Sequence, residues 1–411
     1  MDNVNFPFPE LLAPAGDEER LHAALLFGAD AVYLAGTHFG MRSAPANFDE
    51  DGLKRAVDLC HSRGKKVYVT CNTLPREQEL KLLPDYLSFL DDIGVDALII
   101  ADLGVFELAK RYAPHCAKHV STQFGVVNSA TAKMLYDMGA SRVVLARELS
   151  LTEITDIRAN TPVQLELEAF VHGAMCLSYS GRCMLSAYLT GRDSNRGDCA
   201  QPCRWKYELI EPNRPDYTFS VEEHGTETFL FNANDLCMLE HIPQLHRAGI
   251  SSFKIEGRAK AAYYVAGVTN AYRLALDDYK QSGCKETYTL PEWLKHEPYT
   301  VRHRPYGTGF YFDEPSQNTV SGGYVREYQA VAVVTGYEDG CLLLSQRNRF
   351  FDGDTLEALI PGQKPLLLVA KGLQDDNGEC IASAPHATMA LRLPFDEPLP
   401  VGTYLRKRIK D

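Results

Sequence analysis

Residues 10–36 read ELLAPAGDEERLHAALLFGADAVYLAG, in which two short apolar runs flank a segment with helical periodicity. The helical segment ends at a glycine just before the second run, which suits a left-handed cap between a helix and the next strand. This order recurs, and eight apolar runs predict strands at residues 10–15, 31–36, 66–71, 97–102, 119–124, 142–147, 164–172 and 252–257. Eight strands with helical crossovers predict an α/β fold, a (β/α)8 barrel of the TIM type. The alternative is an open doubly wound sheet, but no Gly-rich dinucleotide fingerprint follows the first strand.

The chain divides into three parts. Residues 1–285 hold the predicted barrel, which carries a cysteine-rich insertion (174–235) after its seventh strand. Residues 286–324 are rich in Pro, Gly and Tyr and are interpreted as an ordered connector. Residues 325–411 change to short apolar runs separated by Gly, Asp and Asn, which predicts a small all-β barrel domain. Since the insertion follows a barrel strand, we expect it at the carboxyl-terminal face, where barrel enzymes have their active sites.

The composition is that of an ordinary globular protein, with 45% hydrophobic and 23% charged residues. The formal net charge of −12 argues against non-specific coating of nucleic acid, but it is compatible with a local basic patch that docks one folded RNA. The chain does not open with a basic region and a long apolar run, and no apolar stretch approaches the roughly 20 residues of a membrane helix. We therefore expect a cytoplasmic protein without a membrane partner.

Five of the eleven cysteines gather in one part of the sequence. They are Cys176, Cys183, Cys199, Cys203 and Cys237. Thiolates around one point bind a soft metal or an iron–sulfur cluster, or they carry out redox chemistry. The paired CxxC knuckles of a zinc site are absent, whereas an iron–sulfur site takes its ligands from several loops at irregular spacing. The six scattered cysteines are interpreted as ordinary small apolar residues.

Polar residues end or follow nearly every predicted strand, where a barrel enzyme holds its catalytic groups. The predicted catalytic residues are His172, Arg147, Glu148 and Glu168, and the predicted substrate-binding residues are Arg42, Asn72, Gln123, Lys254, Glu256 and Arg258. Ion pairs that brace the rim are the structural alternative for Arg147–Glu148 and Glu256–Arg258. Convergent arginines at such positions can hold a small dicarboxylate by bidentate contacts. No GxSxG elbow, HExxH helix or Walker loop is found.

One long string, ELEAFVHGAMCLSYSGRCMLSAYLTGRDSNRGDCAQPCRW (166–205), resembles the signature of the collagenase-like peptidases of family U-32. Further matches to the family are ELLAPAG (10–16), STQ (121–123), LARELS (145–150), NDLCM (234–238), FKIEGR (253–258) and HRPYGTGFYF (303–312). The resemblance covers essentially the whole chain. Within the family, the architecture is similar to that of bacterial proteins that hydroxylate the wobble uridine of tRNA at C5 without molecular oxygen.

The resemblance implies a [4Fe–4S] cluster, prephenate as a co-substrate, the anticodon loop of tRNA as partner, and the iron–sulfur assembly machinery that would load the cluster. The implied ligand set is Cys176, Cys183, Cys199 and Cys237, with Cys203 as the alternative fourth ligand. The oligomeric state stays open. For RNA, local positive charge is offered by KHEPYTVRHRPY (295–306) and LRKRIK (405–410), and stacking surfaces by Tyr306, Phe310, Tyr311 and Phe312. A peptidase and a non-enzymatic iron–sulfur RNA-binding or assembly factor are the competing functions.

Overall fold

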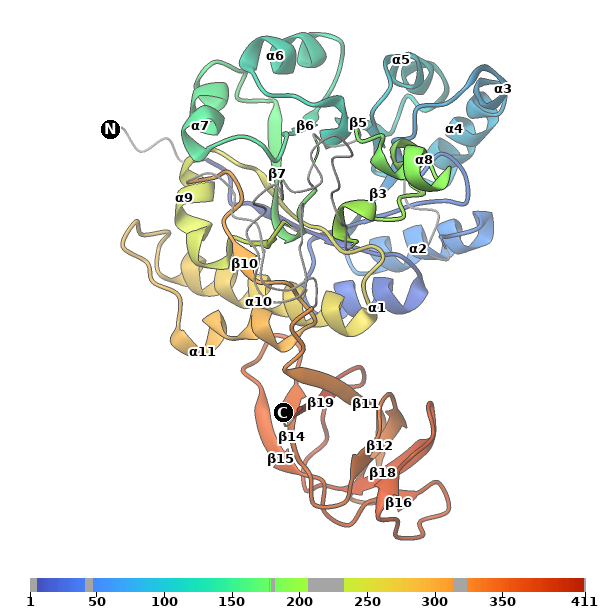
Figure 1. Ribbon diagram of the computed structural model, residues 1–411, viewed down its shortest axis with the longest axis vertical. Helices are drawn as coiled ribbons and strands as arrows, with labels where there is room; N and C mark the ends of the chain where they lie inside the picture. Colours follow the sequence, from blue (N-terminus) through green and yellow to red (C-terminus); the bar gives the residue numbers. More distant parts are fainter. Residues whose placement is uncertain are drawn as a thin grey trace, which may run out of the picture.

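The computed structural model describes residues 6–40, 47–176, 178, 182–205, 233–312 and 324–409. Its larger part is a barrel of eight parallel strands with helices around it (Figure 1). The eight strands are β1 (Glu10–Pro14), β2 (Ala31–Leu34), β3 (Lys66–Cys71), β4 (Ala97–Ile100), β5 (Ala117–Val120), β6 (Arg142–Val144), β7 (Glu166–Ala174) and β9 (Ser252–Ile255). Strand β9 pairs in parallel with both β1 and β7, which closes the barrel. The predicted (β/α)8 barrel is confirmed.

Helices cover the outside of the barrel. They are α1 (Glu18–Leu26), α2 (Glu50–Ser62), α3 (Glu77–Leu80), α4 (Leu83–Asp92), α5 (Leu103–Tyr112), α6 (Ser129–Asp137), α7 (Leu151–Ala159), α9 (Ile242–Arg247) and α10 (Ala262–Gln281). Several begin at a side chain that accepts a hydrogen bond from a first-turn amide, as Asp17, Asp49, Asp102 and Asn128 do. At α7, Ser150 and Glu153 form a reciprocal capping box. These caps set where each strand-to-helix turn ends and therefore fix the rim of the barrel.

The predicted strand at 119–124 is only partly correct. Strand β5 ends at Val120, and the next residues form a 3-10 turn, η1 (Thr122–Phe124). The hydroxyl of Ser121 accepts from the amide of Gln123 and starts this turn, and Gly125 ends it in the left-handed region with φ of 75°. The turn brings Thr122 and Gln123 to the mouth of the barrel.

Two short strands extend the barrel sheet beyond the eight that were predicted. Strand β8 (Asp235–Cys237) runs antiparallel to the end of β7, so that Cys237 lies opposite His172. Strand β10 (Tyr306–Gly307) then pairs in parallel with β8. The described parts of the insertion also contain α8 (Leu185–Thr190), η2 (Ser194–Arg196) and η3 (Pro202–Arg204). Arg196 ties the insertion to α3, because its Nη1 lies 3.1 Å from Oε2 of Glu79.

The C-terminal part is an antiparallel all-β domain, as predicted, and Figure 1 shows it in orange and red beside α10 and α11 (Glu292–Lys295). Its strands are β11 (Tyr328–Glu338), β12 (Cys341–Gln346), β14 (Thr355–Leu359), β15 (Leu366–Val369), β16 (Gln374–Asp375), β18 (Ala390–Pro394) and β19 (Tyr404–Arg408), with a separate pair β13 (Phe350–Phe351) and β17 (Ser383–Ala384). Arg406 of β19 is buried against η5 (Glu297–Thr300), and its Nη1 and Nη2 each lie 2.9 Å from a carboxylate oxygen of Glu297. This paired contact joins the domain to the connector.

Candidate active site

A cavity of about 310 Å³ lies at the carboxyl-terminal ends of the barrel strands, between those ends and the cysteine-rich insertion. Its lining includes these predicted substrate-binding or catalytic residues: Asn72, Gln123, Arg147, Lys254, Glu256 and Arg258. Active sites of barrel enzymes lie at this face. The structure thus brings most of the predicted strand-end residues to one place.

The cavity is also lined by Cys176, Cys183, Cys199 and Cys203 of the insertion. None of the four forms a disulfide; Cys176 is exposed and the other three are half-buried. The backbone amide of Gln201 lies 3.3 Å from Sγ of Cys199, which is the kind of contact that supports a thiolate ligand. Four soft sulfur donors facing one space suit an iron–sulfur cluster in number and chemistry.

Four thiols on the lining of one cavity match the number of ligands that a [4Fe–4S] cluster takes. Among the described residues, no three His, Cys, Asp or Glu side chains are grouped so that they could hold one metal ion. A cubane bonds each thiolate to a different iron, so its ligands stand farther apart than those around one ion. The arrangement of the four thiols is therefore compatible with the donor set of a [4Fe–4S] cluster.

Cys237 is not among the described residues that line the main cavity. It is on β8 and lines a second, smaller cavity of about 150 Å³ together with Tyr299 and Tyr306. Burial raises the pKa of its thiol to about 12, which disfavours the thiolate that a metal requires. The choice of the fourth ligand between Cys237 and Cys203 stays a prediction, and the cavity lining favours Cys203.

Three residues of the cavity lining each carry a buried side-chain polar atom that has no hydrogen-bond partner among the described residues. These atoms are Oγ1 of Thr70, Oε1 of Gln123 and Nε of Arg147. The rest of the Arg147 guanidinium is held in place, since Nη1 donates to the carbonyl of Ala174 at 2.8 Å and the group lies 4.0 Å above the ring of Phe170. Buried polar atoms are nearly always satisfied, so these three side chains are candidates to turn toward a polar ligand in the cavity.

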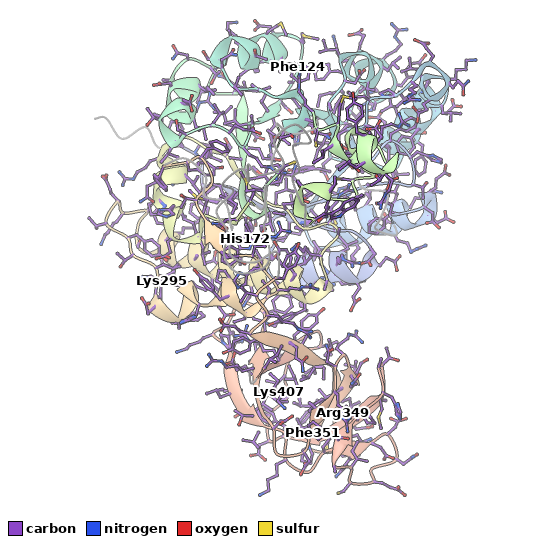
Figure 2. All side chains as sticks on the ribbon, viewed as in Figure 1. Phe124, His172, Lys295, Arg349, Phe351 and Lys407 are labelled. Atoms are coloured by element: carbon purple, nitrogen blue, oxygen red, sulfur yellow. The ribbon has the colours of Figure 1, made fainter. Side chains whose placement is uncertain are left out.

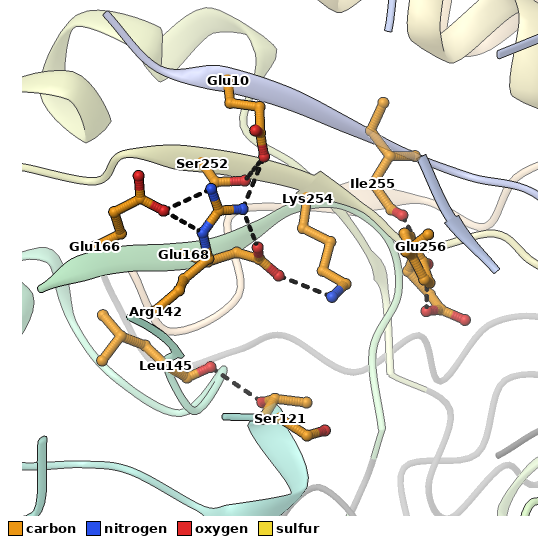
Figure 3. A network of polar contacts seen from close by, with 12 residues as sticks. Glu10, Ser121, Arg142, Leu145, Glu166, Glu168, Ser252, Lys254, Ile255 and Glu256 are labelled. Atoms are coloured by element: carbon orange, nitrogen blue, oxygen red, sulfur yellow. Dashed lines mark hydrogen bonds and ion pairs between the residues drawn. The ribbon is translucent and has the colours of Figure 1, made fainter. Parts of the chain in front are cut away.

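An ionic network forms the floor of the cavity (Figure 3). Lys254 is buried and places its Nζ 2.8 Å from Oε1 of Glu168, and Arg142 donates to the other oxygen of Glu168 at 3.0 Å. Arg142 also contacts Glu10 and Glu166, each at 2.7 Å. Burial alone would raise the pKa of Glu168, but the cations of Lys254 and Arg142 outweigh it and lower that pKa. Glu168 is not among the described residues that line the cavity. It contacts Lys254, which does line the cavity.

His172 is not among the described residues that line the main cavity. The pairing of β7 with β9 shifts register between Phe170 and His172, and this irregularity turns His172 away from the barrel interior. Its imidazole (labelled in Figure 2) contacts the rings of Tyr264 and Tyr272 on α10, and its Nε2 lies 3.3 Å from the hydroxyl of Tyr306. Burial lowers the pKa of His172 to about 3, with the nearby charge of Lys260 contributing.

This environment makes stability depend on pH. The folded protein keeps His172 neutral, whereas the unfolded chain takes up a proton below about pH 6.5, so the free energy of unfolding falls as the pH drops from 6.5 toward 3. Between pH 7.5 and pH 5 the residue should account for a loss of about 2 kcal/mol. Urea unfolding of the wild type and of His172→Gln, each at pH 7.5 and at pH 5, measures this loss in the free energy of unfolding. The exposed His22→Gln is the matched control, and equal losses in His172→Gln and the wild type would refute the assignment.

Other predicted residues fall in different places. Glu148 is half-buried and is not a described lining residue, and Arg42 lies outside the described residues. Of the predicted stacking residues, Tyr311 is buried with its hydroxyl 2.6 Å from the carbonyl of Phe170, and Phe312 packs against His241. Tyr311 and Phe312 are not among the described residues that line the main cavity.

The sequence missed several residues that line the cavity. Thr70 lies on β3, two positions before Asn72, so the period-two alternation of a strand could have indicated that both side chains point to the same side. Lys260 lies two positions after Arg258, and Tyr324 closes the connector. No local pattern singled out Tyr324, because its place depends on a contact with a distant part of the chain.

Comparison with known proteins decides the family. A family model described as peptidase family U32 matches residues 16–321, and a second, described as the peptidase family U32 C-terminal domain, matches residues 326–406. The chain belongs to peptidase family U32. Within this family it is 36% identical over 407 residues to "tRNA hydroxylation protein P1" of Bacillus subtilis, which covers 97% of this chain and 94% of that protein.

Two further U32-like relatives carry other names. The "23S rRNA 5-hydroxycytidine C2501 synthase" of Escherichia coli is 40% identical over 268 residues, which is 65% of this chain and 39% of that protein. The "Collagenase" of Porphyromonas gingivalis is 32% identical over 320 residues, or 74% of each chain. Within the described part of this U32 chain, no helix combines the length and the apolar character needed to cross a membrane.

Proposed function

We propose that this protein hydroxylates C5 of a uridine in tRNA with a [4Fe–4S] cluster bound by Cys176, Cys183, Cys199 and Cys203. One observation carries the proposal: these thiols face the same cavity as a set of buried polar atoms without partners, at the catalytic face of a barrel. It agrees with the names of the relatives in Bacillus subtilis and Escherichia coli, which refer to hydroxylation of tRNA and of rRNA.

The cavity has suitable groups for a uracil ring. Uracil offers one N–H donor and two carbonyl acceptors on its edge, and the cavity offers the acceptor Oε1 of Gln123, the donor Nε of Arg147 and the hydroxyl of Thr70. A base in the anticodon loop must leave its stack to reach such a recess. We assign these three side chains to hold the flipped base.

The cationic side of the cavity suits a small dicarboxylate. Arg147 and Arg258 line it from two strand ends, and Lys254 presents its ammonium from the floor. Replacing C5–H by C5–OH removes two electrons and adds an oxygen, so the reaction needs an oxygen donor and an electron acceptor. Prephenate, which carries two carboxylates and a hydroxyl, is the proposed co-substrate for these cations. A bound cluster would supply electron transfer or a Lewis-acidic iron.

The proposed biology follows from this chemistry. A cluster requires loading by the iron–sulfur assembly machinery, and reduced thiols together with a tRNA substrate imply a cytoplasmic location. The residues of this chain would then position the base and the dicarboxylate and hold Lys254 against Glu168.

The test is mass spectrometry of tRNA nucleosides from a strain that lacks the gene. We expect 5-hydroxyuridine derivatives to disappear and to return when the wild-type gene is supplied. Complementation with Arg147→Gln should fail although the purified variant still binds tRNA, because Arg147 contacts the base and not the tRNA body. Unchanged nucleosides in a strain without a paralogue would contradict the proposal, and modification by Arg147→Gln would contradict the role of that residue.

The relative named collagenase makes a peptidase the competing function. A cysteine peptidase requires a histidine base within reach of its thiol. No histidine lies among the described residues that line the cavity, and His172 is behind the barrel wall with a pKa of about 3. Hydrolysis of gelatin by the anaerobically purified, cluster-free protein would favour the peptidase.

A further inference from the structure

A cluster of positive charge surrounds one aromatic side chain at the mouth of the cavity. Nζ of Lys260 and Cζ of Arg302 each lie 4.6 Å from the centroid of the Tyr324 ring, and Cζ of Arg304 lies 4.9 Å from it. Contacts of this kind between a cation and a ring are individually weak, at about 0.5–1 kcal/mol where they are exposed. Three cations on one ring are therefore held together against their own repulsion.

Two of the three cations lack a carboxylate. Among the described residues, no Asp or Glu oxygen lies within salt-bridge distance of Lys260 or of Arg302. Their charges are at most about 9 Å apart, since both lie 4.6 Å from the same point, and this separation is comparable to the Debye length of about 8 Å at physiological salt. Arg304 differs, because it is buried and its backbone amide donates to Asp235. Within the described part of the chain, the Lys260–Arg302 pair is thus a positive site without a carboxylate partner.

The positions of the pair indicate the shape of its ligand. Lys260 and Tyr324 line the cavity, whereas Arg302 is exposed and is not a described lining residue. A ligand that contacts both cations therefore passes from the inside of the cavity to the outside. A polymer with repeated negative charges can contact both cations at once, one inside the cavity and one outside it.

We propose that Lys260 and Arg302, held by Tyr324, bind the phosphates that flank the nucleotide whose base enters the cavity. This inference rests on the proposed function and adds the route by which RNA reaches the site. Extruding a base leaves its two neighbouring phosphates at the mouth of the pocket. Cations beside an aromatic ring are a common way to follow a single-stranded backbone. The segment 295–306, which the sequence predicted as a source of positive charge for RNA, contributes Arg302 and Arg304.

Binding of an unmodified tRNA transcript, measured by fluorescence anisotropy between 50 and 200 mM salt, tests the inference through the slope of log Kobs against log[salt]. Each lost phosphate contact reduces the magnitude of that slope by about 0.7–0.9. Lys260→Ala/Arg302→Ala should therefore lower it by about 1.5 and weaken binding at 100 mM salt on the order of tenfold. The charge-conserving Lys260→Arg/Arg302→Lys should keep the wild-type slope.

The matched control is Lys54→Ala/Lys110→Ala, which removes the same net charge from exposed positions on α2 and α5. A control that lowers the slope as much as the test variant would overturn the inference, because the effect would then be one of net charge. Wild type that binds tRNA with a slope equal to that of Lys260→Ala/Arg302→Ala would also overturn it and leave the proposed function standing. Wild type that binds no tRNA would overturn both.

Discussion

Cys203→Ser should lose nearly all of its iron and sulfide after anaerobic purification, while Cys237→Ser should stay brown with the iron and sulfide content of the wild type. Cys203 lines the cavity with Cys176, Cys183 and Cys199, whereas Cys237 lines a separate space behind the barrel wall. Burial raises the pKa of the Cys237 thiol to about 12, so it remains a protonated, packed side chain. A cluster that loses one of four thiolates has an open iron and is released or degraded during purification.

Colorimetric iron and sulfide assays, together with visible absorption, measure the result. Circular dichroism of both variants shows that the barrel has folded, so that a colourless sample reports on ligation and not on misfolding. Cys284→Ser is a second control, since Cys284 is half-buried, follows α10 and does not line the cavity. Loss of the cluster from Cys237→Ser with retention in Cys203→Ser would reverse the assignment of the fourth ligand. A colourless wild type would remove the cluster from the proposed function.

The barrel was predictable because its signals are local. Apolar runs with helical segments between them marked all eight strands. The position of Cys237 was not predictable in the same way. It depends on β8, which has three residues and pairs with the end of β7 more than 60 residues away. A three-residue strand carries too little alternation to be recognised, and spacing along the chain does not give distance in space.

On strand β7 the period-two alternation of side chains holds as far as Phe170 and then fails. Alternation along a strand places Glu166 and Glu168 on one face, and both contact Arg142. The same alternation continued to His172 predicts a side chain directed into the barrel. The irregularity after Phe170 breaks the period, and His172 packs against α10 instead. Such a bulge is set by the register with β9, which is a tertiary contact.

The two carboxylates of β7, Glu166 and Glu168, should differ strongly in their contribution to the free energy of unfolding. Glu168→Gln should lower the free energy of unfolding by about 3–5 kcal/mol, because it leaves Lys254 and Arg142 buried beside a neutral amide. Glu166→Gln is the matched control on the same strand and the same arginine, with an expected loss below about 1 kcal/mol. The difference follows from exposure, because the Glu168 side chain is 0% exposed and the Glu166 side chain is 46% exposed. Water can therefore take the place of the Glu166 carboxylate beside Arg142 but not that of the Glu168 carboxylate.

Urea unfolding of the cluster-free proteins at pH 7.5 measures both variants, and equal losses would show that the network is solvated and not buried. The pH dependence gives an independent check. Because Lys254 and Arg142 hold the pKa of Glu168 below its usual range despite burial, its contribution is present at neutral pH and is lost as acid protonates it. The stability gap between the wild type and Glu168→Gln should therefore narrow below about pH 4. Since the same carboxylate holds Lys254 at the cavity floor, Glu168→Gln should also weaken dicarboxylate binding, which places Glu168 as a positioning residue.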